Sequence, residues 1–231
     1  ATLRLVNQQM LVDQASARLW QTALTDVRVS TDRANPEDVL RLAVESQFSG
    51  PLQDGLRLLQ DTPLASATGD SLRDWAGEGQ VQGQFALDLP LGDAQGQFTF
   101  TSASGLRASD LSGVFLGRRV TGSLESHQGR LQATFSGQHG IDSLLGWPLL
   151  AEVPIGLAEG QLDWQAQASI DDGGTSLRID SDLTGARLDL PGPFAKPAEQ
   201  AMPSSLMLRM ADQRQRWQFN LGADLRGDVH T

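Results

Sequence analysis

The stretch Trp217-Gln218-Phe219-Asn220-Leu221-Gly222-Ala223-Asp224-Leu225 decides the fold. Its apolar side chains occupy alternate positions, and polar or small residues stand between them. Because successive side chains of a β-strand point to opposite faces of the sheet, this pattern predicts a strand with one apolar and one polar face. A sheet built from such strands must either bury its apolar face or use it.

The same alternation recurs along most of the sequence. Its other occurrences are Leu3–Leu5, Val27–Val29, Leu40–Val44 with Phe48, Val81–Leu89, Phe98–Phe100, Val114–Leu116, Val120–Leu124, Leu131–Phe135, Leu162–Ile170, Leu177–Ile179, Leu183, Leu188–Leu190 and Leu206–Met210. Short connections with turn residues, such as Ser126-His127-Gln128-Gly129, join antiparallel neighbours. The sequence therefore predicts an all-β protein with a long curled antiparallel sheet, one continuous segment over residues 1–231 cut from a longer polypeptide.

Three segments break this rhythm. Leu52, Leu56 and Leu59 have helical spacing behind Pro51 and predict a short helix near 51–61. A second short helix is expected near 140–146, ending at Gly146. The proline-rich segment 190–203 predicts a loop or a sheet edge.

Composition excludes several function classes. The formal net charge of -10 over 231 residues argues against nucleic-acid binding and against electrostatic docking on an anionic membrane. Cysteine is absent, so the sequence offers no disulfide and no thiolate chemistry. Lys196 is the only lysine, which we interpret as coding bias. No run approaches the roughly 20 apolar residues of a membrane-spanning helix.

No catalytic or metal-binding constellation is recognisable, and the sequence predicts no cofactor. His127, His139 and His230 lack metal-ligand spacing, and the turn-like contexts of His127 and His139 predict that these two lie on the solvated surface. Asp171-Asp172-Gly173-Gly174 lacks the staggered oxygen ligands of a calcium loop and predicts a hairpin turn. Trp147 is expected in a local hydrophobic cluster, the alternative being that it caps one end of a trough or touches lipid. The remaining candidates are scattered carboxylates interpreted as solvent-facing, namely Asp88, Glu125, Glu159 and Asp163.

Three runs carry a resemblance to a known family. The clearest is Ser181–Ala198, in which a strand leads into Leu190-Pro191-Gly192-Pro193 and then Lys196-Pro197-Ala198. The other two are Gly77–Leu91 and Leu106–Phe135. In these runs the chain resembles the YhdP family, large AsmA-like and TamB-like envelope proteins of Gram-negative bacteria, over roughly residues 50–220. The resemblance implies a periplasmic protein anchored in the inner membrane, whose curved sheet forms a groove that carries phospholipid toward the outer membrane.

On this interpretation the apolar face is a groove that solvates acyl chains, with membranes at the two ends of the full-length protein and protein partners unknown. The residues expected to line it are Val81, Phe85, Leu87, Leu89, Leu162, Trp164, Ile170, Leu206, Leu208, Trp217, Phe219 and Leu221. The alternative is a structural or adhesive β-sandwich module that binds a protein partner. Under the groove hypothesis, replacing Leu162 or Phe219 with Asp should block lipid passage more than it unfolds the protein.

Overall fold

The structure is a computed structural model. It describes residues 2–6, 9–32, 39–62, 64–65, 78–91, 103–127, 129–145, 157–171, 173–192, 195–211, 214–223 and 225–230. The expected strand Phe98–Phe100 and Trp147 lie outside these residues, so their predictions remain open.

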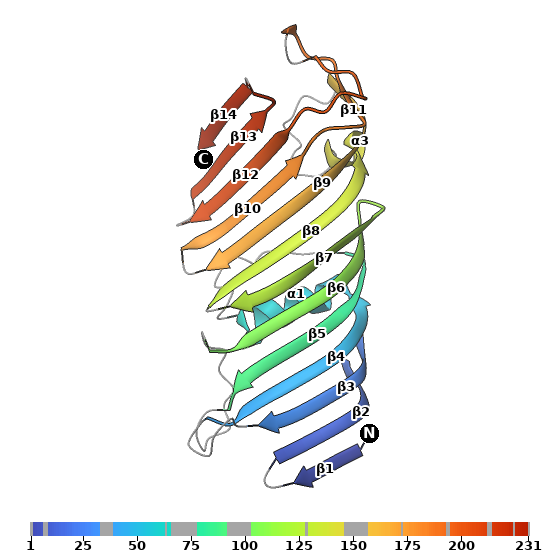
Figure 1. Ribbon diagram of the computed structural model, residues 1–231, viewed down its shortest axis with the longest axis vertical. Helices are drawn as coiled ribbons and strands as arrows, with labels where there is room; N and C mark the ends of the chain where they lie inside the picture. The colour runs from blue at the N-terminus through green and yellow to red at the C-terminus, as the bar shows by residue number, and fades with distance from the viewer. Residues whose placement is uncertain are drawn as a thin grey trace. The chain divides into compact units, whose positions relative to one another are not determined.

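Strands make up most of the described chain (Figure 1). They are β1 (Thr2–Val6), β2 (Gln9–Leu19), β3 (Thr22–Asp32), β4 (Arg41–Pro51), β5 (Gln80–Pro90), β6 (Gly105–Phe115), β7 (Arg118–His127), β8 (Arg130–Gly140), β9 (Ala158–Asp171), β10 (Gly174–Ser181), β11 (Ala186–Leu188), β12 (Ser204–Ala211), β13 (Arg214–Leu221) and β14 (Leu225–His230). The helices among the described residues are α1 (Leu52–Asp61) and α3 (Ile141–Leu145).

The described strands follow one another in sequence order from β1 to β10 and then through β12, β13 and β14, with β11 paired beside β9. Thirteen strands thus form one antiparallel sheet that does not close into a barrel. This confirms the predicted all-β fold with short helices. The two facing sheets of a β-sandwich, the expected alternative, do not occur in this strand order.

The chain divides into two compact units. Unit 1 comprises residues 1–113, 122–133 and 169–173, and unit 2 comprises residues 114–121, 134–168 and 174–231. Each unit is described separately below.

In unit 1 the register separates apolar from polar side chains. Leu42 lies opposite Leu89 and Val44 opposite Leu87 on β4 and β5, and Leu87 in turn lies opposite Leu106 on β6. Directly opposed residues share a face, so these residues form one apolar face. The intervening positions form the opposite face, which we call the polar face; there Arg41 bonds Asp88 at 2.9 Å.

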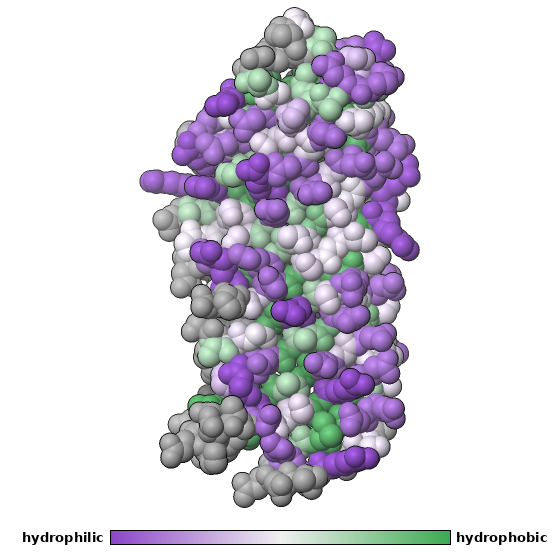
Figure 2. Space-filling view, in the orientation of Figure 1, coloured by the Kyte–Doolittle hydropathy of each residue, from purple (hydrophilic) through white to green (hydrophobic). Residues whose placement is uncertain are grey.

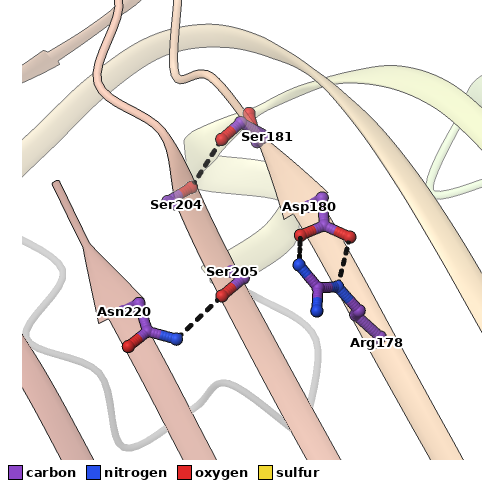
Figure 3. A network of polar contacts seen from close by, with 6 residues as sticks. All are labelled: Arg178, Asp180, Ser181, Ser204, Ser205 and Asn220. Atoms are coloured by element: carbon purple, nitrogen blue, oxygen red, sulfur yellow. Dashed lines mark hydrogen bonds and ion pairs between the residues drawn. The ribbon is translucent and has the colours of Figure 1, made fainter. Parts of the chain in front are cut away.

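Unit 2 repeats this separation on its C-terminal strands. Leu208 lies opposite Trp217, Leu206 opposite Phe219, and Leu221 opposite Leu225. The alternate positions are polar (Figure 3): Arg178 makes two bonds to Asp180, at 2.7 and 2.8 Å, and Asn220 donates to Ser205 at 3.0 Å. The Asp180 carboxylate also raises the pKa of the Arg178 guanidinium above its ordinary value.

The sequence analysis did not predict β2 and predicted only the end of β6. Both strands have β-bulges. The register of β2 shifts on either side of Ala15, and Gln14 has φ 54. The register between β5 and β6 shifts after Gln82, and Asp110 of β6 has φ 52. A bulge inserts one residue and reverses the odd–even alternation beyond it. For this reason a search for uninterrupted alternation finds only the end of β6 and misses β2.

Candidate functional site

The apolar face of unit 1 is closed over by side chains. Buried residues of β5, β6, β8 and β9 form one cluster with Leu64, which follows α1 in sequence. We call this cluster the covered patch: Leu64, Leu89, Leu106, Leu131 and Ile170, each at most 9% exposed. Leu58 and Leu59 of α1 pack against this patch. The helix lies behind the strands in the view of Figure 1. Part of the apolar face is therefore occupied by the chain's own helix.

Polar contacts attach α1 to the sheet. Asp54 is only 7% exposed, and its Oδ2 accepts hydrogen bonds from the backbone N–H of Gln21 and from Oγ1 of Thr22, both at 2.9 Å. The guanidinium of Arg57 lies 4.5 Å from the ring centroid of Trp20, a cation–π contact. The sequence pattern identified the helix but not this attachment. Leu52, expected on its apolar side, is 37% exposed.

A second cluster, in unit 2, surrounds one of the expected groove residues. Leu162 of β9 packs against Ile141 of α3 and Ala186 of β11, which are 6% and 0% exposed. Its neighbours thus bury much of its side chain. Trp217, Phe219 and Leu221 of β13 belong to neither hydrophobic cluster of the described residues.

Lys196 fixes the segment that completes this second cluster. It is 2% exposed, and its Nζ donates hydrogen bonds to the carbonyl oxygens of Ala186, at 2.5 Å, and Pro197, at 3.0 Å. Burial lowers the pKa of its ammonium group, an effect that the charges of Asp182 and Glu199 oppose. The single lysine, interpreted from sequence as coding bias, has a structural role that only its burial reveals.

His139 is a correction to the sequence analysis, which placed it on the solvated surface. The residue is 0% exposed in unit 2. Its Nδ1 lies 2.8 Å from Nε1 of Trp164 and its Nε2 lies 2.6 Å from the carbonyl oxygen of Phe115. Because an indole nitrogen can only donate, Nδ1 is the acceptor, and Nε2 carries the proton and donates to Phe115. The buried ring nitrogens of His139 and Trp164 therefore have hydrogen-bond partners within unit 2.

Among the described residues, no hydrophobic cluster covers the apolar face of β13 and β14. Its members form what we call the open patch: Trp217, Phe219, Leu221, Leu225 and Val229. Phe219 is 37% and Val229 50% exposed, and the other three are half-buried. Neither hydrophobic cluster of the described residues includes a residue of β12, β13 or β14. The ring of Phe219 lies over Gly227, where a Cβ would be 2.0 Å from Cε1 of the ring.

The structure distributes the expected groove residues among these environments. Leu89 and Ile170 belong to the covered patch, and Phe85 and Leu87 pack against it. Leu206 and the buried Leu208 lie opposite residues of the open patch. Val81 is half-buried and lies opposite Gly50 and Gly113.

The opposite face carries the scattered carboxylates that the sequence analysis interpreted as solvent-facing. Figure 2 views the sheet from the side away from α1, and hydrophilic residues are spread over that face. Glu125, Glu159 and Asp163 are exposed, and Asp88 is held by Arg41. Asp171, at the turn between β9 and β10, binds Arg130 and accepts a hydrogen bond from the backbone N–H of Gly173. Within the described residues, no group of three or more His, Cys, Asp or Glu side chains could hold a metal ion.

Comparison with protein families matches residues 89–231 to the YhdP protein family. The chain belongs to the YhdP family. This family comprises AsmA-like envelope proteins of Gram-negative bacteria and is a lipid-transport family. The match confirms the resemblance inferred from the sequence. It contains the run Ser181–Ala198, whereas most of Gly77–Leu91 precedes it.

Within the YhdP-matched region lie the open patch, the cluster around Leu162 and the buried Lys196. The helix α1 lies before the matched region. No curated protein and no solved structure matches the chain. Neither described helix has the length and apolar character that a membrane span requires.

Proposed function

We propose that this protein carries phospholipid between the inner and outer membranes, with acyl chains lying on the apolar face of the sheet and head groups remaining in water. The observation that carries the proposal is the open patch of β13 and β14 in a chain of the YhdP family. Exposed contiguous apolar surface is uncommon on soluble proteins unless something binds it.

Acyl chains suit this surface because they require no directional partners. Removing each methylene from water contributes about 0.8 kcal/mol, so an aliphatic and aromatic wall is sufficient to hold a chain. Such a wall needs no sequence motif beyond alternation, in keeping with the absence of a recognisable binding motif in the sequence. The half-buried residues Val81, Phe85 and Leu87 would contribute the same kind of surface in unit 1.

The proposal places the protein in the periplasm, as part of a longer polypeptide anchored in the inner membrane. Family membership supports an envelope location. Nothing in the described residues suggests an energy source, so in this proposal the direction of lipid movement is imposed by other components.

Site-specific photo-crosslinking in the intact protein tests the proposal. A benzophenone side chain replaces Phe219, on the apolar face, or its neighbour Asn220, on the polar face. After irradiation in cells, phospholipid should be attached at position 219 and not at position 220, as measured by mass spectrometry of the purified protein. Equal labelling at both positions, or none at either, would refute the proposal.

A further inference from the structure

The position of α1 has a consequence for lipid movement, which rests on the proposed function. Leu58 and Leu59 of the helix occupy the same apolar surface that acyl chains would use in unit 1. We infer that α1 is a displaceable cover: acyl chains reach the covered patch only when the helix leaves it, and Asp54 is the anchor that holds the helix in place.

The helix has little stability apart from its contact with the sheet. It has 10 residues, fewer than the roughly 12–15 that an isolated helix needs in water. Pro51 at its N-cap makes no side-chain hydrogen bond to the first turn. Gly55 lies in its interior and faces open space, with nothing within 4 Å of the position where a Cβ would stand. Its helical structure therefore depends on docking, and a helix that undocks will also lose structure.

The polar interactions that oppose undocking include the two bonds of Asp54 and a hydrogen bond from the backbone N–H of Leu52 to the carbonyl oxygen of Gly79, at 2.9 Å. The carboxylate of Asp54 accepts two hydrogen bonds in a nearly buried position, and hydrogen bonds to a charged group are stronger than those between neutral groups. The contact between Arg57 and Trp20 adds a weaker attraction, since the Arg57 side chain is 50% exposed. Losing the Asp54 bonds should shift the docking equilibrium by at least about tenfold toward the undocked helix.

The apolar half of the interface does not discriminate between the helix and a lipid. Leucine side chains and acyl chains are both aliphatic, and each methylene buried favours binding by about fourfold. An acyl chain can therefore make the same kind of apolar contact with the covered patch that Leu58 and Leu59 make. Polar contacts, above all those of Asp54, favour the helix over a lipid, because a hydrocarbon chain cannot accept the hydrogen bonds of Gln21 and Thr22.

Releasing the helix and locking it should have opposite effects. Asp54→Ala removes the anchor, and Asp61→Ala is the matched control, because Asp61 is exposed on the same helix and its ion pair, with Arg57 at 3.4 Å, lies within the helix. For the lock, the double variant Trp20→Cys, Arg57→Cys is joined by a short bis-maleimide. The chain has no other cysteine, so the linkage is unambiguous.

The readout is photo-crosslinking of phospholipid at position 85, beside the covered patch, normalised to labelling at position 219 in the open patch. Asp54→Ala should raise the ratio several-fold, Asp61→Ala should leave it unchanged, and the linked double variant should lower it relative to the same protein before linkage. Circular dichroism and thermal unfolding check that each variant keeps its sheet; if Asp54→Ala does not, the linked variant alone decides the question.

The outcomes separate the two proposals. Labelling at position 219 with an unchanged ratio in the linked variant would overturn the inference about α1 and leave lipid transport standing. The loss of labelling at position 219 in every variant would overturn the proposed function and the inference with it.

Discussion

The covered patch of unit 1 and the open patch of unit 2 are built from the same kind of strand, yet they present different surfaces. Both arise from alternating apolar positions on neighbouring antiparallel strands. In unit 1, residues such as Leu106 are 3% exposed beneath packed leucines, whereas Phe219 in unit 2 is 37% exposed. Alternation therefore creates an apolar face but does not determine whether that face is filled or available. That depends on the segments between the strands.

The largest expected difference between the two patches is in folding stability. Leu106→Asp places a carboxylate in a fully packed cluster and should destabilise the protein by about 4 kcal/mol or more. Phe219→Asp removes a partly exposed ring and should cost about 1–2 kcal/mol. Urea denaturation measures both variants, and similar losses of stability would contradict the distinction between the patches.

Leu162→Asp sharpens the comparison within unit 2. Because Leu162 packs against Ile141 and Ala186, its replacement should destabilise the protein by about 2–4 kcal/mol, more than Phe219→Asp. This revises the expectation from the sequence, which treated the two positions alike. If Leu162→Asp keeps wild-type stability and loses only lipid labelling, the packing of Leu162 against Ile141 and Ala186 does not stabilise the fold.

Removing the anchor of α1 should have a smaller effect on stability. Asp54→Ala leaves the N–H of Gln21 and the hydroxyl of Thr22 without their acceptor and should cost about 1.5–3 kcal/mol. The control Asp61→Ala should stay within about 0.5 kcal/mol, since its ion pair is exposed. Thermal unfolding of the two variants compares them directly; equal shifts would mean that Asp54 does not hold the helix.

Two glycines on the apolar faces provide a milder test of packing. A Cβ at Gly83 would lie 2.8 Å from the backbone oxygen of Ser109, so Gly83→Ala should force strands apart at a cost of about 1–3 kcal/mol. The three atoms nearest to a Cβ at Gly227 all belong to the ring of Phe219, which can turn away because it is partly exposed, so Gly227→Ala should cost less than about 1 kcal/mol. Chemical denaturation should show a larger loss of stability for Gly83→Ala than for Gly227→Ala. The reverse order would imply that the ring of Phe219 is held rigidly.

The smallest expected effect concerns pH and Lys196. Burial lowers the pKa of its ammonium group below the ordinary 10.5, so between the two values the unfolded chain binds more protons than the folded chain. Stability should therefore rise as pH increases through this window. Lys196→Met should abolish that rise, as measured by denaturation midpoints at successive alkaline pH values; an identical pH profile in the variant would exclude Lys196 as its source.

The segments that pack on the two clusters, α1 in unit 1 and the segment around Lys196 in unit 2, are held in place in a similar way. In each, a nearly buried charged side chain bonds to backbone of another segment: Asp54 accepts from the N–H of Gln21, and Lys196 donates to the carbonyl of Ala186. Neither could be identified from local sequence, because an Asp within a helix and a Lys within a proline-rich loop are ordinarily solvated. Their partners lie 33 and 10 residues away.

The sequence by itself determined the strand class, the faces of most strands and the family resemblance, because side-chain alternation and short turns are local properties. The alternation pattern did not predict β2 or most of β6, because bulges near Gln14 and Asp110 each insert one residue and reverse the alternation that follows. Tertiary structure alone decided that His139 is buried against Trp164, that α1 occupies the covered patch and that the open patch remains exposed. Each depends on contacts between segments distant in sequence, and periodicity within one segment carries no information about them.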